Sequence, residues 1–306
     1  MIFQIPKDIK FTTHYKKLNV ISLLLTILSI FILLFKGLNL GVDFKGGTLI
    51  EIRNEGVQIS ISEIRQSLMK MQIGDVTVKK FGKENDFLVK IETTDMNDTN
   101  FIKSINDKLS SDVGSEINFR RVENVGPKVS NELLKDGLLA ISLSLAAMLI
   151  YIWIRFEWQF SVAAIAALVH DVIITLGIFS LFSFEINLSI VAAVLTIVGY
   201  SMNDTVVIFD RIRENLKKYT KIPISEISNN STNETLSRTL ITSVTTLLAL
   251  LSIFIFGGAI LKGFSFAMII GVIIGTYSSI FVAAPILNYT NVNSKSVIKD
   301  EDNTSF

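Results

Sequence analysis

The chain contains no cysteine and only two histidines, His14 and His170, among its 306 residues. The absence of cysteine excludes disulfide bonds, thiolate metal sites and cysteine nucleophiles. With so few histidines a histidine-rich metal site is not expected either, and we expect no bound cofactor. The net charge of +1 provides no bulk attraction for a polyanion, so we expect no nucleic-acid partner. The chemistry of the chain must therefore come from carboxylates, arginines, hydroxyls and the backbone.

Hydrophobic residues are abundant instead: they make up 49% of the chain, and the mean hydropathy is +0.49. Soluble domains of this size rarely reach such a value, so the composition indicates a membrane protein. Residues 18–35 form an apolar run that would span roughly 27 Å as a helix, close to one hydrocarbon core. Lysines precede this run as in a signal peptide, but no small-x-small cleavage site follows it, so we interpret it as an uncleaved first span. With five further apolar stretches, the predicted spans are 18–35, 133–154, 160–182, 186–209, 239–261 and 264–287.

Basic residues are unevenly distributed over the short connections between these spans. They crowd residues 1–17 and the connecting segment 210–238, whereas the turns on the opposite side contain only Lys262. The positive-inside rule places basic short loops in the cytoplasm, so both termini, 1–17 and 288–306, are predicted to be cytoplasmic. The long segment 36–132 would then lie outside the cytoplasm.

Residues 36–132 have the pattern of a soluble α+β domain. Alternating apolar residues predict strands there, and apolar residues at helical spacing predict helices. The predicted elements are a strand at 47–53, a helix at 60–71, strands at 75–81 and 87–92 joined by a turn at 82–86, a helix at 99–109 and a strand at 116–122. This order is that of a ferredoxin-like domain, and without a nucleophile motif or phosphate loop we expect it to bind rather than to catalyse. The predicted fold class is thus an α-helical polytopic membrane protein of six transmembrane helices with an inserted ferredoxin-like α+β domain.

Ionisable residues lie inside or at the edge of three predicted spans. Asp171 follows His170 near the centre of the third, Asp204 lies near the cytoplasmic end of the fourth, and Arg238 precedes the fifth. A charged side chain at the centre of a bilayer costs about 3 kcal/mol even on insertion scales, so such residues face a bundle interior or a water path. Intramembrane carboxylates are functional by default, which favours Asp204 and Asp171 as proton-binding groups. The alternative is structural. Asp204 would cap or salt-bridge helices near the interface, His170 would pair with its neighbour or with a serine or threonine, and Arg238 would be a snorkelling residue at the interface.

The spacing of the polar residues predicts which of them act together. Asp204 and Arg211 are seven residues apart, which is two helical turns, so they would share a face of the fourth span. Threonines follow Arg238 at helical spacing: Thr242, Thr245 and Thr246. They predict a polar stripe that leads inward from a fixed cation. A carboxylate that exchanges a proton beside such a cation would form a proton-binding switch.

Two rival interpretations remain open at this point. The first is an intramembrane aspartyl protease with Asp171 and Asp204 as its dyad, but such a dyad shares a proton at about 3 Å. The two residues are predicted at different depths and the usual Gly-x-Gly-Asp motif is missing, so we expect no enzymatic activity. The second is a scaffold, in which the carboxylates only stabilise the packing of helices that hold partners together.

Glycines mark two further places in the sequence. Gly271-Val-Ile-Ile-Gly275 in the sixth span has the small-x-x-x-small spacing that permits close helix packing. Gly46 and Gly47 are most simply explained by a turn next to the membrane. Neither pattern by itself indicates an activity.

Several longer motifs are distributed from the first span to the last. They are Gly41-Val-Asp-Phe-Lys-Gly-Gly47, Val125-Gly-Pro-Lys-Val-Ser130, His170-Asp171-Val172, the stretch GYSMNDTVVIFDRIRE from Gly199 to Glu214, the stretch SRTLITSVTT from Ser237 to Thr246, and Gly275-Thr-Tyr-Ser-Ser279. Together they resemble the SecF branch of the SecD/SecF family, which belongs to the accessory complex of bacterial protein export. The long motif of the fourth span is very specific for this family.

The resemblance implies a six-helix half of the exporter superfamily that pairs with the six-helix half of SecD. Such a complex would use the proton motive force, with protons as the coupling ion, to promote export of unfolded preproteins. The resemblance also implies contact with the SecYEG channel, with YajC and YidC as further partners, in the bacterial cytoplasmic (inner) membrane.

Site residues are carried over by position within these motifs. Asp204 matches the family's proton-carrying aspartate of the fourth span, and Arg238 matches its fifth-span arginine. Asp171 matches the aspartate of the His-Asp pair in the third span. The polar residues expected to support them are His170, Asn203, Thr205, Thr242 and Thr246.

Overall fold

The computed structural model describes residues 9–54, 59–80, 85–92, 99–290 and 292. Most of the predicted turn at 82–86 and large parts of both predicted cytoplasmic termini lie outside these residues. The chain divides into two compact units. The helical unit contains Met1–Leu38, Ala140–Phe184 and Ser189–Phe306, and the inserted unit contains Asn39–Leu139 and Glu185–Leu188.

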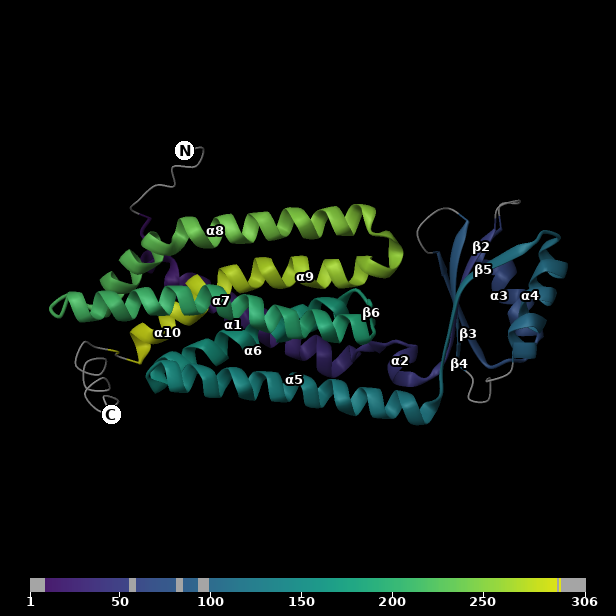
Figure 1. Cartoon of the computed structure of the whole chain (residues 1–306), viewed down its shortest axis with the longest axis horizontal. Coiled ribbons are helices and arrows are strands. Elements are labelled where there is room, and N and C mark those ends of the chain that lie inside the picture. The colour runs from purple at the N-terminus through teal and green to yellow at the C-terminus, as the bar shows by residue number, and fades with distance from the viewer. Residues whose placement is uncertain (1–8, 55–58, 81–84, 93–98, 291, 293–306) are drawn as a thin grey trace. The chain divides into compact units, whose positions relative to one another are not determined.

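Long apolar helices build the helical unit (Figure 1). They are α1 (Thr12–Lys36), α5 (Pro127–Arg155), α6 (Trp158–Leu181), α7 (Leu188–Lys218), α8 (Ile224–Phe256) and α9 (Gly258–Ser278), which a π-helical turn (Ser279–Ala283) connects to α10 (Ala284–Tyr289). In the described part of the chain six helical stretches are long and apolar enough to cross a membrane, the last from Leu261 to Tyr289. The predicted six-span fold class is therefore confirmed.

The helices differ in how much of their surface they bury. On α1 the large apolar side chains are mostly exposed, Leu34 by 78%, which suits a helix that faces lipid. On α6, by contrast, most residues are buried, including His170 and Asp171. Its Phe160 packs edge-on against Phe209 of α7, with ring centroids 5.1 Å apart. Helix α6 therefore lies in the core of the bundle, and its polar residues lie there with it.

The connection predicted as a basic loop at 210–238 is mostly helical in the structure. Helix α7 continues to Lys218, and α8 already begins at Ile224. Ion pairs support these extensions: Arg211 pairs with Glu214 one turn further along α7 (2.6 Å) and with Glu234 of α8. The basic residues of this segment are thus partly neutralised by acidic partners.

The inserted unit contains a four-stranded antiparallel sheet with strand order β3-β4-β2-β5. Its elements are β1 (Asn39–Leu40), α2 (Val42–Lys45), β2 (Gly47–Asn54), α3 (Ile61–Lys70), β3 (Asp75–Lys80), β4 (Asp86–Glu92), α4 (Thr99–Val113), β5 (Ile117–Val125) and β6 (Glu185–Ile186). Helices α3 and α4 lie on the same side of the sheet (Figure 1), where Ile64 and Leu109 join Ile50, Phe87 and Val89 in a fully buried core. This arrangement confirms the predicted ferredoxin-like α+β domain.

Helices α3 and α4 of this domain are linked by Asp112. Its carboxylate accepts hydrogen bonds from Ser67 Oγ and from Lys108 Nζ, both at 2.7 Å. These bonds lower the pKa of Asp112 from its ordinary value of 3.8, and the bond from Lys108 contributes most. Because the pKa is lowered in the folded protein, the stabilisation is present above the unfolded value and is lost as the pH falls through the folded value.

Lys108→Ala is therefore expected to raise the pKa of Asp112 towards 3.8. Carboxyl NMR of selectively labelled aspartate in the full-length chain would measure the change. Lys103→Ala, on the same helix and without a contact to Asp112 in the structure, serves as the control and should leave this pKa unchanged. An equal titration of Asp112 in both variants would contradict the assignment of Lys108 as the main cause.

Candidate functional site

Polar side chains from four helices meet inside the helical unit. On α7 they lie at i, i+3 and i+4 and so share one face of the helix. We call the group the polar centre; it comprises Asp171 of α6, Ser201, Asp204 and Thr205 of α7, Ser243 of α8, and Thr276 and Ser278 of α9. Both aspartates predicted from the sequence belong to it.

Asp171 is fully buried and has hydrogen-bond partners for both carboxyl oxygens. Ser201 and Ser278 donate to Oδ2 at 2.5 and 2.8 Å, and His170 Nδ1 lies 2.9 Å from Oδ1. These bonds connect α6 to α7 and to α9. These hydrogen bonds fix the conformation of the Asp171 carboxylate, so Asp171 connects three helices.

Glycines of α9 allow this helix to approach α7 closely. A Cβ atom on Gly275 would lie 2.9 Å from the Cβ of Ser201, and a Cβ on Gly271 would overlap with the side chain of Ile197. The predicted role of this glycine pair in packing is thus visible in the structure. The same approach brings Ser201 and Ser278 to one carboxylate.

Gly271→Ala is expected to destabilise the helical unit by about 1–3 kcal/mol, the usual cost of overpacking a tight contact. Gly263→Ala on the same helix is the control, because its Cβ would lie at an ordinary 3.4 Å from Ile190. Thermal unfolding of the two purified variants in the same detergent would compare them. Equal melting temperatures would show that α9 does not depend on this close approach.

Asp204 is also buried, with 2% of its surface exposed, but it is partnered quite differently. Ser243 of α8, Thr276 of α9 and the neighbouring Asn203 lie close enough to interact with the carboxyl group. Its Oδ2 atom is buried and has no hydrogen-bond partner in the described part of the chain. The carboxyl group of Asp204 therefore lacks the complete set of hydrogen-bond partners that holds Asp171.

Arg238 lies near enough to Asp204 for the two charges to interact. The two form no direct ion pair within the ranges that the structure covers, and Arg238 itself is exposed at the surface of the helical unit. Arg211, which the helical spacing places on the face of Asp204, pairs instead with Glu214 and Glu234. Arg211 thus has acidic partners on its own helix and on α8 and forms no ion pair with Asp204 among the described residues.

The other predicted polar residues occupy different positions around the polar centre. Thr205 is buried and its hydroxyl lies 2.8 Å from that of Ser279, the first residue of the π-helical turn. Thr242 donates to the Arg238 carbonyl of its own helix, and Asn203 is exposed. His170 has a buried Nε2 atom without a partner among the described residues, while Thr246 is half-buried. Of these five residues, Asn203 and His170 contact a carboxylate.

Ser201, Ser243, Thr276 and Ser278 were not predicted as site residues. Serine and threonine are common in membrane helices, and their hydroxyls often bond to the backbone one turn earlier, as that of Thr196 does. A usable signal is nevertheless present, since Ser201 precedes Asp204 by one turn and Ser278 follows Gly275 by one turn. Only the three-dimensional structure shows that they converge on the two aspartates.

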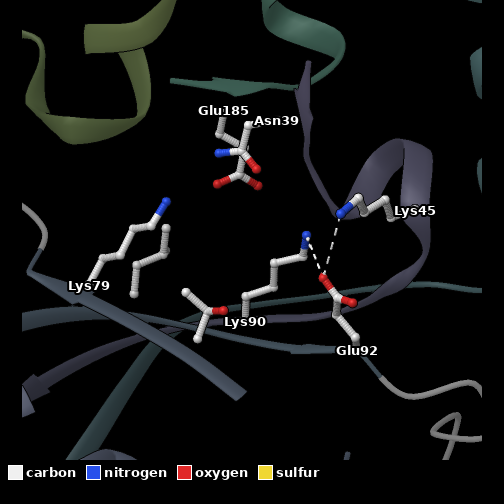
Figure 2. Close-up of a pocket in the computed structure, with 8 residues that line it drawn as sticks. Asn39, Lys45, Lys79, Lys90, Glu92 and Glu185 are labelled. Carbon is white, nitrogen blue, oxygen red and sulfur yellow. Dashed lines mark ion pairs between the residues drawn. The ribbon is translucent and has the colours of Figure 1, made fainter. Parts of the chain in front are cut away.

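The inserted unit carries a separate charged cavity of about 240 Å³ on its sheet (Figure 2). Lys90 and Lys45 both approach Glu92, at 3.4 and 4.0 Å, and Figure 2 shows Lys79 and Glu185 on other sides of the same space. Lysine and glutamate without a nucleophile or metal-ligand set do not indicate catalysis. Among the residues that the structure describes, no group of three or more His, Asp or Glu could hold a metal ion.

The fold and the polar centre together define the class of protein. The chain is a multi-pass α-helical membrane protein with an inserted ferredoxin-like domain and with two buried carboxyl groups between its helices. Carboxyl groups inside membrane helices are costly, and they are usually kept only where they serve a function.

Comparison with known proteins places the chain within that class. Residues 105–293 match the family model "Protein export membrane protein SecD/SecF, C-terminal", and residues 31–53 match the SecD/SecF GG motif. The protein translocase subunit SecF of Rickettsia bellii is 45% identical over 287 residues, 92% of this chain and 94% of the relative. SecF of Cereibacter sphaeroides is 43% identical over 274 residues, 86% and 84% of the two chains. The chain belongs to the SecD/SecF family, and within it to the SecF proteins.

A solved structure agrees with this placement. The crystal structure of SecDF from Thermus thermophilus, described as a translocon-associated membrane protein, superimposes with a TM-score of 0.85 at 33% sequence identity. The match covers 95% of this chain but only 40% of the SecDF chain. The chain therefore spans less than half the length of that protein.

Proposed function

We propose that this SecF-family chain, in complex with SecD, uses the proton motive force to promote export of unfolded preproteins across the bacterial cytoplasmic membrane. Protons are the coupling ion, and no cofactor takes part. Asp204 binds and releases the proton, Arg238 responds to its charge, and Asp171 keeps the helices around it in place. The state of Asp204 then sets the position of the inserted domain.

The observation that carries this proposal is the contrast between the two buried carboxyl groups. Asp171 has three polar partners within 2.9 Å, whereas Asp204 has a buried oxygen without one in the described chain. A purely structural carboxylate would be expected to resemble Asp171. The contrast also favours a transporter over a protease, because no hydrogen bond joins the two carboxyl groups in the part of the chain described.

The energy available from one proton is sufficient for such a role. Moving one charge across 100 mV releases about 2.3 kcal/mol, which biases a two-state arrangement roughly fiftyfold. A bias of this size is enough to rectify the diffusion of an unfolded chain. It is too small for forcing a stably folded domain through a pore, which favours unfolded substrates.

The partners and the orientation follow from the family and from the charge pattern. The names of the family model and of the solved SecDF structure support SecD as the partner that completes the helical assembly. SecYEG, YajC and YidC are further proposed partners. The basic segments 1–17 and 210–238 would face the cytoplasm, which leaves the inserted domain on the outer side, where it meets emerging preprotein.

Preprotein export by membrane vesicles would test this function. Vesicles that contain SecYEG and SecD are compared with and without this chain, each with an imposed proton gradient and after its collapse. We expect the gradient to stimulate export only when both SecD and this chain are present. Equal stimulation in vesicles that lack the chain would contradict the proposal.

A further inference from the structure

We propose that Asp43 is a positioning residue that couples the inserted domain to α7, the helix that carries Asp204. This inference rests on the proposed function, since it concerns how a change at Asp204 reaches the domain. The Oδ2 atom of Asp43 accepts a hydrogen bond from the backbone N–H of Leu188 at 2.8 Å. Leu188 is the first residue of α7, and the N–H groups of a first helical turn have no partner within their own helix. A carboxylate at this place also interacts favourably with the helix dipole.

The chain next to Asp43 is attached to the segment before α7 at two more points. Strands β1 and β6 pair in parallel, with Leu40 opposite Ile186, and the N–H of Gly41 donates to the carbonyl of Ile186 at 2.8 Å. A Cβ atom on Gly41 would lie 3.1 Å from the backbone oxygen of Ile186, so the two backbones approach each other closely here. The start of α7 therefore has little freedom to move without the segment that carries Asp43.

The same segment is also attached to the sheet of the inserted domain. Asp43 lies on the short helix α2, which leads through Gly46 and Gly47 into the central strand β2. Both glycines have positive φ angles, 79° and 119°, and a Cβ on Gly47 would lie 2.5 Å from the carbonyl oxygen of Ile91 in β4. This backbone is available only to glycine, and it lets the chain that leaves α2 enter β2 in close contact with β4.

Residues 185–188 accordingly group with the inserted domain and not with the helical unit, although α7 belongs to the latter from Ser189 onward. From Leu188 the helix continues without interruption to Asp204, about 24 Å away at 1.5 Å per residue. A shift or rotation of α7 at Asp204 must be accommodated at Leu188, where Asp43 holds it. Asp43 thus provides a direct physical connection between the proton-binding group and the domain.

The test uses the intact complex of this chain with a cysteine-free SecD in vesicles. Because the chain has no cysteine, a Lys103→Cys substitution on α4 gives a single labelling site for a fluorophore on the inserted domain. The gradient-driven fluorescence change is recorded in this background alone and with Asp43→Ala, Asp43→Asn or Asp204→Asn. Asp107→Ala, an exposed aspartate of the same domain, is the matched control. Hydrogen exchange of the first turn of α7 is measured on the same samples.

We expect Asp43→Ala to reduce the fluorescence change at least fivefold and to accelerate exchange in the first turn of α7 about fivefold, the usual effect of losing a helix cap. Asp43→Asn keeps an acceptor oxygen, so both of its signals should lie between those of the unsubstituted background and of Asp43→Ala. Asp107→Ala should change neither signal. The infrared band of the protonated Asp204 carboxyl group should remain in Asp43→Ala, which separates lost coupling from lost proton binding.

A full fluorescence response in Asp43→Ala would overturn the inference. If Asp204→Asn also gives a full fluorescence response, the proposed function fails as well. Hydrogen exchange then tests Asp43 separately. Unchanged exchange in the first turn of α7 in Asp43→Ala would show that Asp43 does not hold the start of this helix. If Asp43→Ala does not fold, Asp43→Asn takes its place, and an undiminished response with unchanged exchange in that variant would have the same meaning.

Discussion

Vesicles in which Asn replaces Asp204 are expected to lose the stimulation of export by a proton gradient, while the complex with SecD still assembles. Asparagine keeps the size of the side chain and its contacts with Ser243 and Thr276, but it cannot carry a proton. Because one proton at 100 mV biases a two-state arrangement by at most roughly fiftyfold, the export rate with the gradient should fall by no more than this factor, to the rate without the gradient. The measurement is the ratio of export rates with and without the gradient.

Asp210→Asn provides the control for this prediction. Asp210 lies on the same helix, but it is partly exposed and pairs with Arg155 at 2.8 Å, outside the polar centre. Its replacement should leave the ratio of export rates unchanged. If Asp204→Asn keeps the full response to the gradient, Asp204 is structural; if the variant no longer binds SecD, the chain acts as a scaffold.

Asp171→Ala, unlike Asp204→Asn, is expected to lower the stability of the protein. It removes the carboxylate that accepts hydrogen bonds from Ser201 of α7 and Ser278 of α9. The bonds that connect α6 to these two helices are then lost. Interhelical hydrogen bonds in membranes contribute about 0.6–1.7 kcal/mol each, so the loss should amount to about 1–3 kcal/mol. The melting temperature of the purified complex and the amount of SecD retained with it should both decrease.

Asp171→Asn separates this structural role from a role in proton transfer. The amide oxygen can take the place of Oδ2 and still accept from both serines, so most of the stability should remain, and gradient-stimulated export should remain with it. A stable Asp171→Asn complex that has lost its response to the gradient would instead place Asp171 on the proton path.

Much of the fold could be predicted from the sequence, because its signals are local. Apolar runs longer than a bilayer is thick define the spans, and alternation within 36–132 defines the strands of the ferredoxin-like domain. The parallel pairing of β1 with β6 could not be predicted, since each strand has only two residues and they are far apart in the sequence. The full length of α7 and α8 within 210–238 was not predicted, because it depends on pairs between the two helices such as Arg211 with Glu234.

The polar centre could be predicted only in part, because some of its residues are marked by local sequence and others are brought in from other helices. A carboxylate in an apolar span is conspicuous, so Asp171 and Asp204 stand out from the sequence alone. What distinguishes them is not visible there, because it depends on serines and threonines of other helices. The approach of α9 at Gly275 brings Ser201 and Ser278 to Asp171, while Asp204 keeps an oxygen without a partner among the described residues.

The central claim is that Asp204 exchanges a proton, and infrared difference spectroscopy of the complex with SecD tests it most directly. Spectra recorded across a pH titration report the carbonyl band of protonated carboxyl groups. The account predicts a titrating band that is present in the wild type and in Asp171→Asn and is absent in Asp204→Asn. The same titrating band in all three proteins would contradict the account, because the proton would then bind elsewhere.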